Sequence, residues 1–337
     1  MDNLLFKSYV IDDRSQLAFI KREIHNLVKS EFEEHRVGEI DIVVAEMLSN
    51  VIKYAQRGEI LYRLNPGKEV SLFEIICIDN GPGMKDVNAS TRDGFSTKNT
   101  LGHGLGAITR LSHFSQIYSQ PGWGTIIYAR FFSGDEPIPQ GLHAKLNVRC
   151  INLALPGQHV SGDAIAVRLL EDKILLFAGD GLGHGPFAKD AVDKAIIVLK
   201  KTMSTDASQI IREMNSEIKK SRGLVGTVAV MDIDKKKWEI CGIGNIHTRL
   251  QKGLEYRNYI SNNGIISVNI PGRLENAVWD MEKFQLMIFC SDGIKTHWDL
   301  ARYPSILKYD PMIIAAVIYK DQGRRTDDMT ILIVKVT

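Results

Sequence analysis

Residues 79–84, DNGPGM, and residues 101–106, LGHGLG, place five glycines in two short segments of the N-terminal half. Glycine costs chain entropy, so this density is expected where backbone must approach another group closely or take a positive φ. The first segment puts Asp79 at the end of an apolar, strand-like run, where its carboxylate can accept a hydrogen bond from an exocyclic amine such as that of adenine. The second opens a helical pattern, whose free N–H groups favour phosphate. Together the segments predict one nucleotide site.

A helix expected over residues 41–57 adds polar side chains to the same half of the chain. Within its mostly apolar surface, Glu46, Asn50 and Lys53 fall at positions i, i+4 and i+7, which gives one polar stripe. The alternative for this stripe is a solvated face, and the alternative for DNGPG is a simple turn. The glycines at 102–107 also match the loose dinucleotide motif, but a polar loop rather than a strand precedes them.

Hydrophobic periodicity divides the chain into two regions. The first 132 residues alternate strand and helix patterns, which predicts an α+β fold with a mostly antiparallel sheet. Residues 133–145 contain two prolines and two glycines without periodicity and are expected to form a linker. Short strands dominate residues 146–337, with helices near 187–201, 205–220 and 311–320. The halves are therefore predicted to be two domains with different folds.

Composition limits the possible functions. The 337 residues carry a formal net charge of +2, so no basic excess points to nucleic acid. No apolar run approaches the ~20 residues of a membrane span, and the N-terminus lacks the pattern of a secretory signal. The four cysteines form no CxxC pair, which fits a reducing compartment. We therefore expect a cytoplasmic protein with no nucleic-acid or membrane partner.

In order and spacing, Glu46-x-x-x-Asn50, Asp79-x-Gly81-x-Gly83 and Gly102-x-Gly104-x-Gly106 resemble the GHKL ATPase and kinase superfamily. The stretch DGFSTKNTLGHGLGAITRLSHF (93–114) is similar, more narrowly, to the RsbT-type serine kinases of bacterial stress signalling, which phosphorylate STAS-domain proteins. The resemblance covers residues 1–132. It implies a GHKL (Bergerat) α/β sandwich that binds ATP with magnesium.

The resemblance implies a role for each motif residue. Asn50 would hold the magnesium that bridges the triphosphate, and Asp79 would read the adenine amine. Glu46 would be the catalytic base that accepts the proton of the attacking hydroxyl. Ser112 and His113 depart from the acids that RsbT-type relatives often carry there, which bears on the identity of the partner. The other residues implied to contact the nucleotide are Lys53, Gly81, Gly83, Thr97, Lys98, Gly102, Gly104 and Gly106.

Acidic residues mark the second half of the chain. Asp163, Asp180, Asp292 and the pair Asp327–Asp328 stand beside apolar strands, so we expect them to gather at one end of a sheet. An isolated Asp-Gly is most often a hairpin turn, but the recurrence of such sites makes that explanation weak here. Clustered carboxylates repel one another and need cations, and oxygen-only ligands favour magnesium or manganese. The pattern predicts a divalent metal site.

The segments GDGLGHG (179–185), GIGNIH (242–247), SDGI (291–294) and DDMT (327–330) resemble the metal-dependent SpoIIE-type protein phosphatases, and most of all the compact RsbX-type members. The resemblance spans residues 146–337 and implies an αββα sandwich. It also implies two manganese or magnesium ions, ~4 Å apart, that activate water for attack on phosphoserine or phosphothreonine.

By position, Asp180 would be the catalytic ligand that bridges both metals, with the Gly181 carbonyl also coordinating. Asp163, Asp292 and either Asp327 or Asp328 would complete the sites. Asp327 is favoured, because the acid directly before the family's Asp/Asn-Met-Thr/Ser is the expected ligand. His184 and His103 both stand in GHG turns and are expected to have structural roles.

The leading hypothesis from these motifs is a bifunctional switch enzyme that phosphorylates a STAS-domain protein and dephosphorylates the same or a related phosphoprotein. One alternative makes the N-terminal domain an ATP-gated anti-sigma module that sequesters a sigma factor or another regulator, fused to an active phosphatase. Another makes only the phosphatase active, with the first domain a nucleotide sensor. Retention of both Glu46 and Asn50 favours the kinase.

Overall fold

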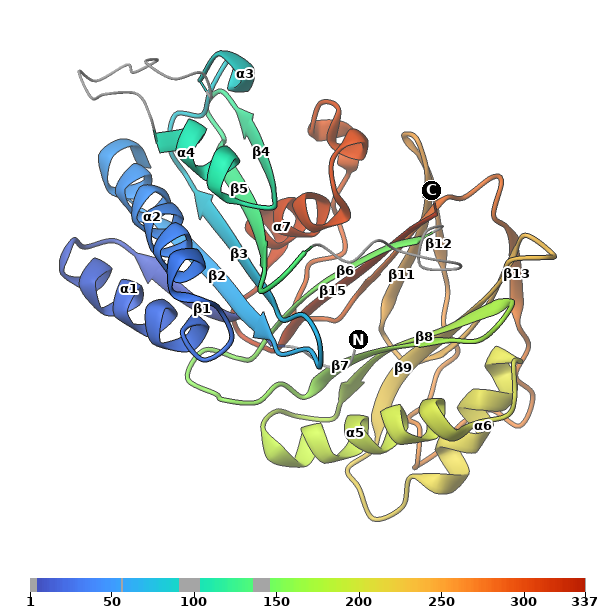
Figure 1. The fold of residues 1–337 in the computed structure, drawn as a ribbon. Helices are drawn as coiled ribbons and strands as arrows, with labels where there is room; N and C mark the ends of the chain where they lie inside the picture. Colours follow the sequence, from blue (N-terminus) through green and yellow to red (C-terminus); the bar gives the residue numbers. More distant parts are fainter. Residues whose placement is uncertain (1–4, 56, 91–103, 136–145, 337) are drawn as a thin grey trace. The chain divides into compact units, whose positions relative to one another are not determined.

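The computed structural model describes residues 5–55, 57–90, 104–135 and 146–336. The chain divides into two compact units, of which one is Phe6–Ile138 and the other consists mainly of Pro139–Thr337. Among the helices in the described ranges, none has the length and apolar character needed to cross a bilayer. Each unit is treated by itself below, and Figure 1 shows the elements of both.

The first unit is built on a five-stranded sheet in the order β1-β2-β3-β5-β4. Every neighbouring pair is antiparallel, as predicted from the short strands and turns of this half. The strands are β1 (Lys7–Ile11), β2 (Gly58–Asn65), β3 (Leu72–Asp79), β4 (Phe114–Gln120) and β5 (Gly124–Phe132).

Helices cover one face of this sheet (Figure 1). Their apolar side chains interdigitate with alternate strand residues, so that Ile24, Val44 and Leu48 share one core with Ile75 and Phe131. Burial of such side chains is the main favourable term in folding. The helices are α1 (Ser15–Val28), α2 (Glu34–Asn50), the short α3 (Val87–Ser90) and α4 (Gly104–Leu111). This arrangement confirms the predicted α/β sandwich.

The helix expected over residues 41–57 differs from prediction at both ends. α2 begins earlier, at Glu34, and its α-helical hydrogen bonding ends at Asn50, where a π-helical turn η1 (Val51–Ala55) takes over. The wider turn breaks the 3.6-residue period. The i+7 spacing therefore does not put Lys53 on the helix face that carries Glu46 and Asn50. π turns are frequent at functional sites, which directs attention to this end of α2.

The second unit contains two five-stranded antiparallel sheets, ordered β13-β10-β9-β8-β7 and β12-β11-β14-β15-β6. The first consists of β7 (Asp163–Leu169), β8 (Lys173–Gly181), β9 (Leu224–Asp232), β10 (Lys237–Ile243) and β13 (Ala277–Asp280). The second consists of β6 (Leu146–Leu153), β11 (His247–Lys252), β12 (Glu255–Tyr259), β14 (Leu286–Cys290) and β15 (Met329–Val336).

Two apolar layers hold the second unit together. Side chains from both sheets, among them Leu176, Trp238, Phe289 and Leu332, form the core between them. A second core lies outside the first sheet, under α5 (Pro186–Lys201) and α6 (Ala207–Glu217). On the second sheet, α7 (Pro311–Gln322) packs against β6 and β15. The layering is the predicted αββα sandwich.

Asp310 joins the start of α7 to the second sheet. Its Oδ1 accepts a hydrogen bond from the Met312 N–H (2.8 Å) and so caps the helix. The same carboxylate pairs with the Arg149 guanidinium of β6 through Nε (3.1 Å) and Nη2 (3.2 Å). A cap is worth ~1 kcal/mol, and removing one partner of a buried ion pair strands the other charge.

We expect Asp310→Ala to lower the free energy of unfolding of the second unit by about 3 kcal/mol, the sum of a lost cap and a broken ion pair with Arg149. Asp206→Ala is the matched control, because Asp206 also caps a helix, accepting from Gln209 N–H at 2.8 Å, but forms no ion pair among the described residues. That change should cost only ~1 kcal/mol. Urea unfolding followed by tryptophan fluorescence measures both, and equal losses would contradict the role of Arg149.

Candidate functional site

In the first unit, the end of α2 and the start of α4 come together around Glu46. Both Glu46 and Asn50 are partly exposed on α2, one turn apart. A Cβ added at Gly104, the first residue of α4, would lie 2.5 Å from Glu46 Oε2 and 4.0 Å from Asn50 Nδ2. A larger residue at position 104 would therefore push the Glu46 carboxylate out of its present position. The structure brings together three residues that the sequence motifs connected.

Asp79 lies at the end of β3, beside the glycine turn. Its Oδ1 accepts hydrogen bonds from the backbone N–H groups of Gly81 (2.7 Å) and Thr125 (3.2 Å). These bonds fix the orientation of the carboxylate. Gly81 packs against Ala55 of η1, which ties the turn to the end of the long helix. Asp79 and the Glu46–Asn50 pair thus stand on elements that contact each other within one unit.

The other predicted nucleotide residues divide into two groups. Gly83 has a φ of +68°, in the left-handed region that favours glycine, and Gly106 is buried in α4. Lys53 lies in the π turn. Thr97, Lys98, Gly102 and His103 lie outside the described residues. The candidate site therefore consists of the glycine turn after β3, the end of α2 with η1, and the start of α4.

In the second unit, the predicted acids come from both sheets rather than from one end of a single sheet, which corrects the expectation from the sequence. Asp163 and Asp180 face each other in the register of β7 and β8. Asp292 follows β14, and Asp327 and Asp328 precede β15. The backbone N–H of Ser291 donates to the Thr330 carbonyl at 3.0 Å, which holds these two segments together.

A cavity of about 470 Å³ opens between these segments. Asp180, Asp292 and Asp327 line it, together with His184 and Asn245. Asn245 Nδ2 donates a hydrogen bond to Asp292 Oδ2 at 3.1 Å. The sequence motif GIGNIH contains Asn245, but a lone asparagine in a turn gave no reason to name it as a site residue. Its hydrogen bond to Asp292 makes Asn245 a candidate site residue as well.

The charges in this cavity repel one another. Burial raises the pKa of Asp180 well above its ordinary value, and the negative charges of Asp163 and Asp292 raise it further. Burial is also the first cause of the raised pKa of Asp163, with the charge of Asp328 adding to it. The raised pKa of Asp292 follows from burial and then from Asp327. Such mutual elevation marks a cluster that a cation would stabilise.

The neighbours Asp327 and Asp328 have different surroundings. Both oxygens of Asp328 accept backbone hydrogen bonds, Oδ1 from Leu155 N–H and Oδ2 from Gly162 N–H, each at 2.6 Å. Its side chain is buried and fastens the β6–β7 connection to the start of β15. Asp327 instead lines the cavity with Asp180. The carboxylate that remains available to a ligand in the cavity is that of Asp327.

The donor set fits a divalent cation in its chemistry. The aspartates offer oxygen, the preferred ligand of magnesium and manganese, and Asp163 Oδ2 is buried with no hydrogen-bond partner in the described ranges. Among the described residues, no three Asp, Glu, His or Cys side chains already form a group arranged to hold one ion. Gly181, whose carbonyl was a predicted ligand, is buried at the end of β8, and its N–H donates to the Gly162 carbonyl at 3.0 Å.

Comparison with known proteins finds both kinase-type and phosphatase-type relatives. A family model of the histidine kinase-like ATPase domain matches residues 12–131. The serine/threonine-protein kinase RsbT of Bacillus subtilis (strain 168) is 34% identical over 90 residues, which are 27% of this chain and 68% of RsbT. The phosphoserine phosphatase RsbX of the same organism is 22% identical over 90 residues, which are 27% of this chain and 45% of RsbX.

Solved structures extend the likeness. One solved structure comes from work on the bacterial stressosome, described as a modular system adapted to control secondary messenger signalling. It is 29% identical to this chain with a TM-score of 0.51, and the match covers 57% of this chain and 100% of that one. The crystal structure of RsbX in complex with magnesium is 17% identical with a TM-score of 0.50, over 57% of this chain and 96% of that one, and this likeness shows the fold alone. The chain therefore belongs to the RsbT-like family of histidine kinase-like ATPase domains, fused to a domain with the fold of the RsbX-type phosphatases.

Proposed function

We propose that the chain is a bifunctional switch enzyme: residues 1–132 use ATP to phosphorylate a serine or threonine of a STAS-domain protein, and residues 146–337 remove phosphate from the same or a related protein. Residues 133–145 would link the two domains. One observation carries this proposal. A single chain holds both the Glu46–Asn50 pair against Gly104 and a cavity lined by Asp180, Asp292 and Asp327.

In the kinase, each described residue has one task. Asp79, oriented by two backbone amides, reads the adenine amine, and Asn50 would hold the magnesium that accompanies ATP. Glu46 accepts the proton of the attacking hydroxyl. Phosphoryl transfer otherwise depends mainly on positioning and electrostatics, so a carboxylate beside the magnesium ligand distinguishes a transferase from a module that only binds nucleotide.

In the phosphatase, Asp163, Asp180, Asp292 and Asp327 would hold two divalent cations, magnesium or manganese. When bound, such cations lower the pKa of water and neutralise phosphate charge. Asn245 holds Asp292 in place through its hydrogen bond to Oδ2. Asp328 keeps the wall of the cavity fixed by binding the Leu155 and Gly162 amides. His184 lines the cavity, where its ring can contact substrate or orient water.

Similarity to RsbT and to a stressosome structure supports a partner from a STAS-containing signalling system. Sequestration of a sigma factor by the ATP-bound first domain is the competing function, because such modules bind the nucleotide with similar motifs. The two functions differ in one observable: only the kinase leaves phosphate on its partner.

Labelled ATP tests the proposal directly. The full chain is incubated with STAS-domain proteins encoded near it, first with magnesium and then with manganese added. We expect label to appear on a serine or threonine of a STAS protein with the wild type, and to be lost again as the phosphatase acts. With Asp180→Asn the label should persist, since a ligand of the second site is gone.

Two outcomes would contradict the proposal. If no STAS protein is labelled while ATP still binds, the kinase function fails, and pull-down of a sigma factor with release by a STAS protein would establish sequestration. If label appears and persists equally with the wild type and with Asp180→Asn, the phosphatase function fails.

A further inference from the structure

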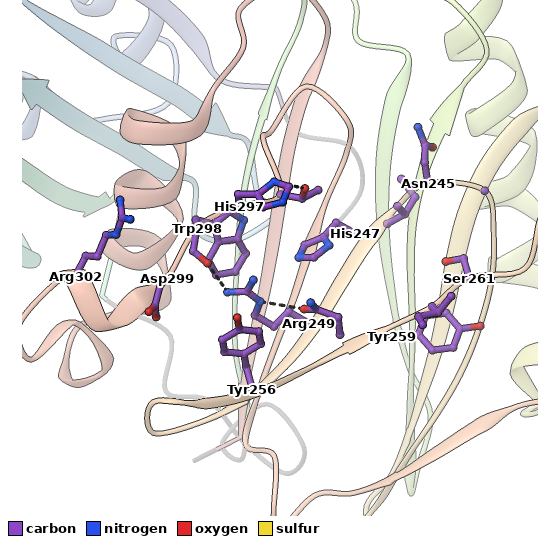
Figure 2. Close-up of a pocket in the computed structure, with 15 residues that line it drawn as sticks. Asn245, His247, Arg249, Tyr256, Tyr259, Ser261, His297, Trp298, Asp299 and Arg302 are labelled. Carbon is purple, nitrogen blue, oxygen red and sulfur yellow. Dashed lines mark hydrogen bonds between the residues drawn. The ribbon is translucent and has the colours of Figure 1, made fainter.

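A second cavity, of about 630 Å³, lies in the phosphatase unit beside the carboxylate cavity. It is formed by β11, β12 and the segment 296–302, and Figure 2 shows its side chains. Gly244 and Asn245 line both cavities. Since Asn245 also donates to Asp292, the two cavities share a wall at the proposed metal site. The two cavities are therefore neighbours along the same edge of the unit.

Arg249 of β11 places a buried positive charge in this cavity. The residue is only 2% exposed. Its Nε donates to Asn258 Oδ1 at 3.2 Å and its Nη1 to the Trp298 carbonyl at 2.9 Å. The guanidinium carbon lies 4.0 Å from the Tyr256 ring centroid and 3.7 Å from that of Trp298. Figure 2 shows the guanidinium between these two rings.

This cation has no acidic partner within the part of the chain that the structure describes. In those ranges the guanidinium donates only to neutral oxygens, from Nε and Nη1, and the charge of Asp299 acts on it without a direct ion pair. Burying a charge without a counter-ion costs several kcal/mol, and the two neutral hydrogen bonds offset only part of that. A site built in this way is stabilised when an anion enters it.

The rest of the lining also suits an anion. Trp298 Nε1, which can only donate, is buried and finds no hydrogen-bond partner among the described residues, as is the case for His247 Nε2 and Ser261 Oγ. Burial, followed by the charge of Arg249, lowers the pKa of His247 to about 4, so its ring is neutral at pH 7 and can bind as a hydrogen-bonding group.

Charge around the cavity is predominantly positive. Arg302 adds a second guanidinium to the lining. Asp299 contributes the single carboxylate among the lining residues, and its Oδ1 already accepts a hydrogen bond from the Ala301 N–H at 2.9 Å. A carboxylate or phosphate matches the planar donor fork of arginine, which binds such groups in a bidentate manner.

We propose that this cavity, which we name the Arg249 pocket, binds an anionic side chain, carboxylate or phosphate, of the protein that the second unit dephosphorylates. The inference rests on the proposed phosphatase function and gives it a specificity element: the substrate carries an acidic or second phosphorylated residue close to the phosphoserine or phosphothreonine. Arg249 is the specificity residue, and the shared wall at Asn245 connects its occupant to the carboxylate cavity.

Binding is tested first without catalysis. The full chain in EDTA is titrated with inorganic phosphate, and its melting temperature is followed. We expect the wild type to gain about 3 °C at saturating phosphate, and Arg249→Met to gain nothing. Arg257→Met is the matched control, because Arg257 is exposed on β12 and does not line the pocket. An equal gain for Arg249→Met and the wild type would overturn the assignment.

A second variant guards against loss of folding. Replacing a buried charge with an apolar side chain is often neutral or stabilising, so Arg249→Met should melt no earlier than the wild type without phosphate. Should it fail to fold, Trp298→Phe keeps an aromatic ring, smaller than the indole, and removes the Nε1 donor. That variant should need several times more phosphate for the same shift, and an unchanged phosphate dependence would count against the pocket.

Specificity is measured on phosphoserine peptides that carry either aspartate or asparagine beside the phosphoresidue. With metal present, the wild type should hydrolyse the aspartate peptide with a kcat/KM about tenfold higher. Arg249→Met should lose this preference, and Arg257→Met should retain it. If phosphate binds at Arg249 but the wild type shows no preference, the pocket holds free phosphate and the side-chain assignment is wrong. If no peptide is hydrolysed, the phosphatase function fails, while the EDTA titration still decides whether the pocket binds anions.

Discussion

Replacing Glu46 with glutamine is expected to lower phosphoryl transfer to a STAS-domain substrate by about 10²- to 10⁴-fold, the usual contribution of a general base. Glutamine keeps the shape and hydrogen-bonding reach of the side chain but cannot take up the proton. Because Asn50 and Asp79 are untouched, the Kd for ATP should stay close to that of the wild type. Steady-state labelling of the substrate and equilibrium binding of a fluorescent ATP analogue measure the two quantities.

Glu34→Gln provides the control on the same helix. Glu34 is exposed in the first turn of α2, far along the helix from Gly104. It should transfer phosphate at the wild-type rate. Full transfer by Glu46→Gln would exclude a base at this position, and a parallel loss of ATP binding would mean that the side chain supports the fold of the site instead of the proton transfer.

Asp180→Asn is expected to reduce phosphatase activity by at least ~10³-fold, since it removes the proposed shared ligand of the metals that would activate water. The same change should stabilise the metal-free protein. The folded-state pKa of Asp180 is raised above its unfolded value by burial and neighbouring carboxylates. A carboxyl group whose pKa is raised by folding does not destabilise the protein at pH values below its unfolded pKa. As the pH rises above about 4, the folded state must keep this group protonated, so the free energy of unfolding falls progressively.

At pH 7, therefore, the metal-free variant should melt about 3–8 °C above the metal-free wild type, because asparagine folds without the proton uptake that the raised pKa imposes on Asp180. Manganese should raise the melting temperature of the wild type and have much less effect on the variant. Asp172→Asn, at the turn between β7 and β8 and away from the cavity, is the matched control and should behave as the wild type. A metal-free variant that melts earlier at pH 7 would show that Asp180 stabilises the fold rather than straining it.

Elements with strong periodicity could be predicted from the sequence, and elements shaped by their neighbours could not. The long apolar strands and α7 lie where their patterns placed them. β12 escaped prediction, since four of its five residues, EYRN, are exposed and charged or polar, as on many edge strands. The π turn after Asn50 also gives no local signal, because it arises from how the end of α2 packs near β2 and the glycine turn.

The site residues show the same limit. Aspartates at strand ends identified the carboxylate cavity, but spacing alone could not tell Asp327 from Asp328. The difference lies in two backbone amides, of Leu155 and Gly162, that come from more than 160 positions earlier in the chain. Arg249 in the run TRLQK looks like an exposed charge. Its burial depends on Tyr256 and Trp298, which only the folded chain brings to it.

The pairing of β6 with β15 has a consequence for the newly made protein. β6 starts the phosphatase unit at Leu146, and its partner strand ends at Val336, so the second sheet stays incomplete until nearly the whole unit has left the ribosome. The first unit has all its strands by Phe132. At about 5–20 residues per second, the remaining ~200 residues take on the order of 10–40 s to synthesise. During each round of translation the first unit can thus mature ahead of the second, and under the proposed function a product truncated after the first unit would add phosphate without removing it.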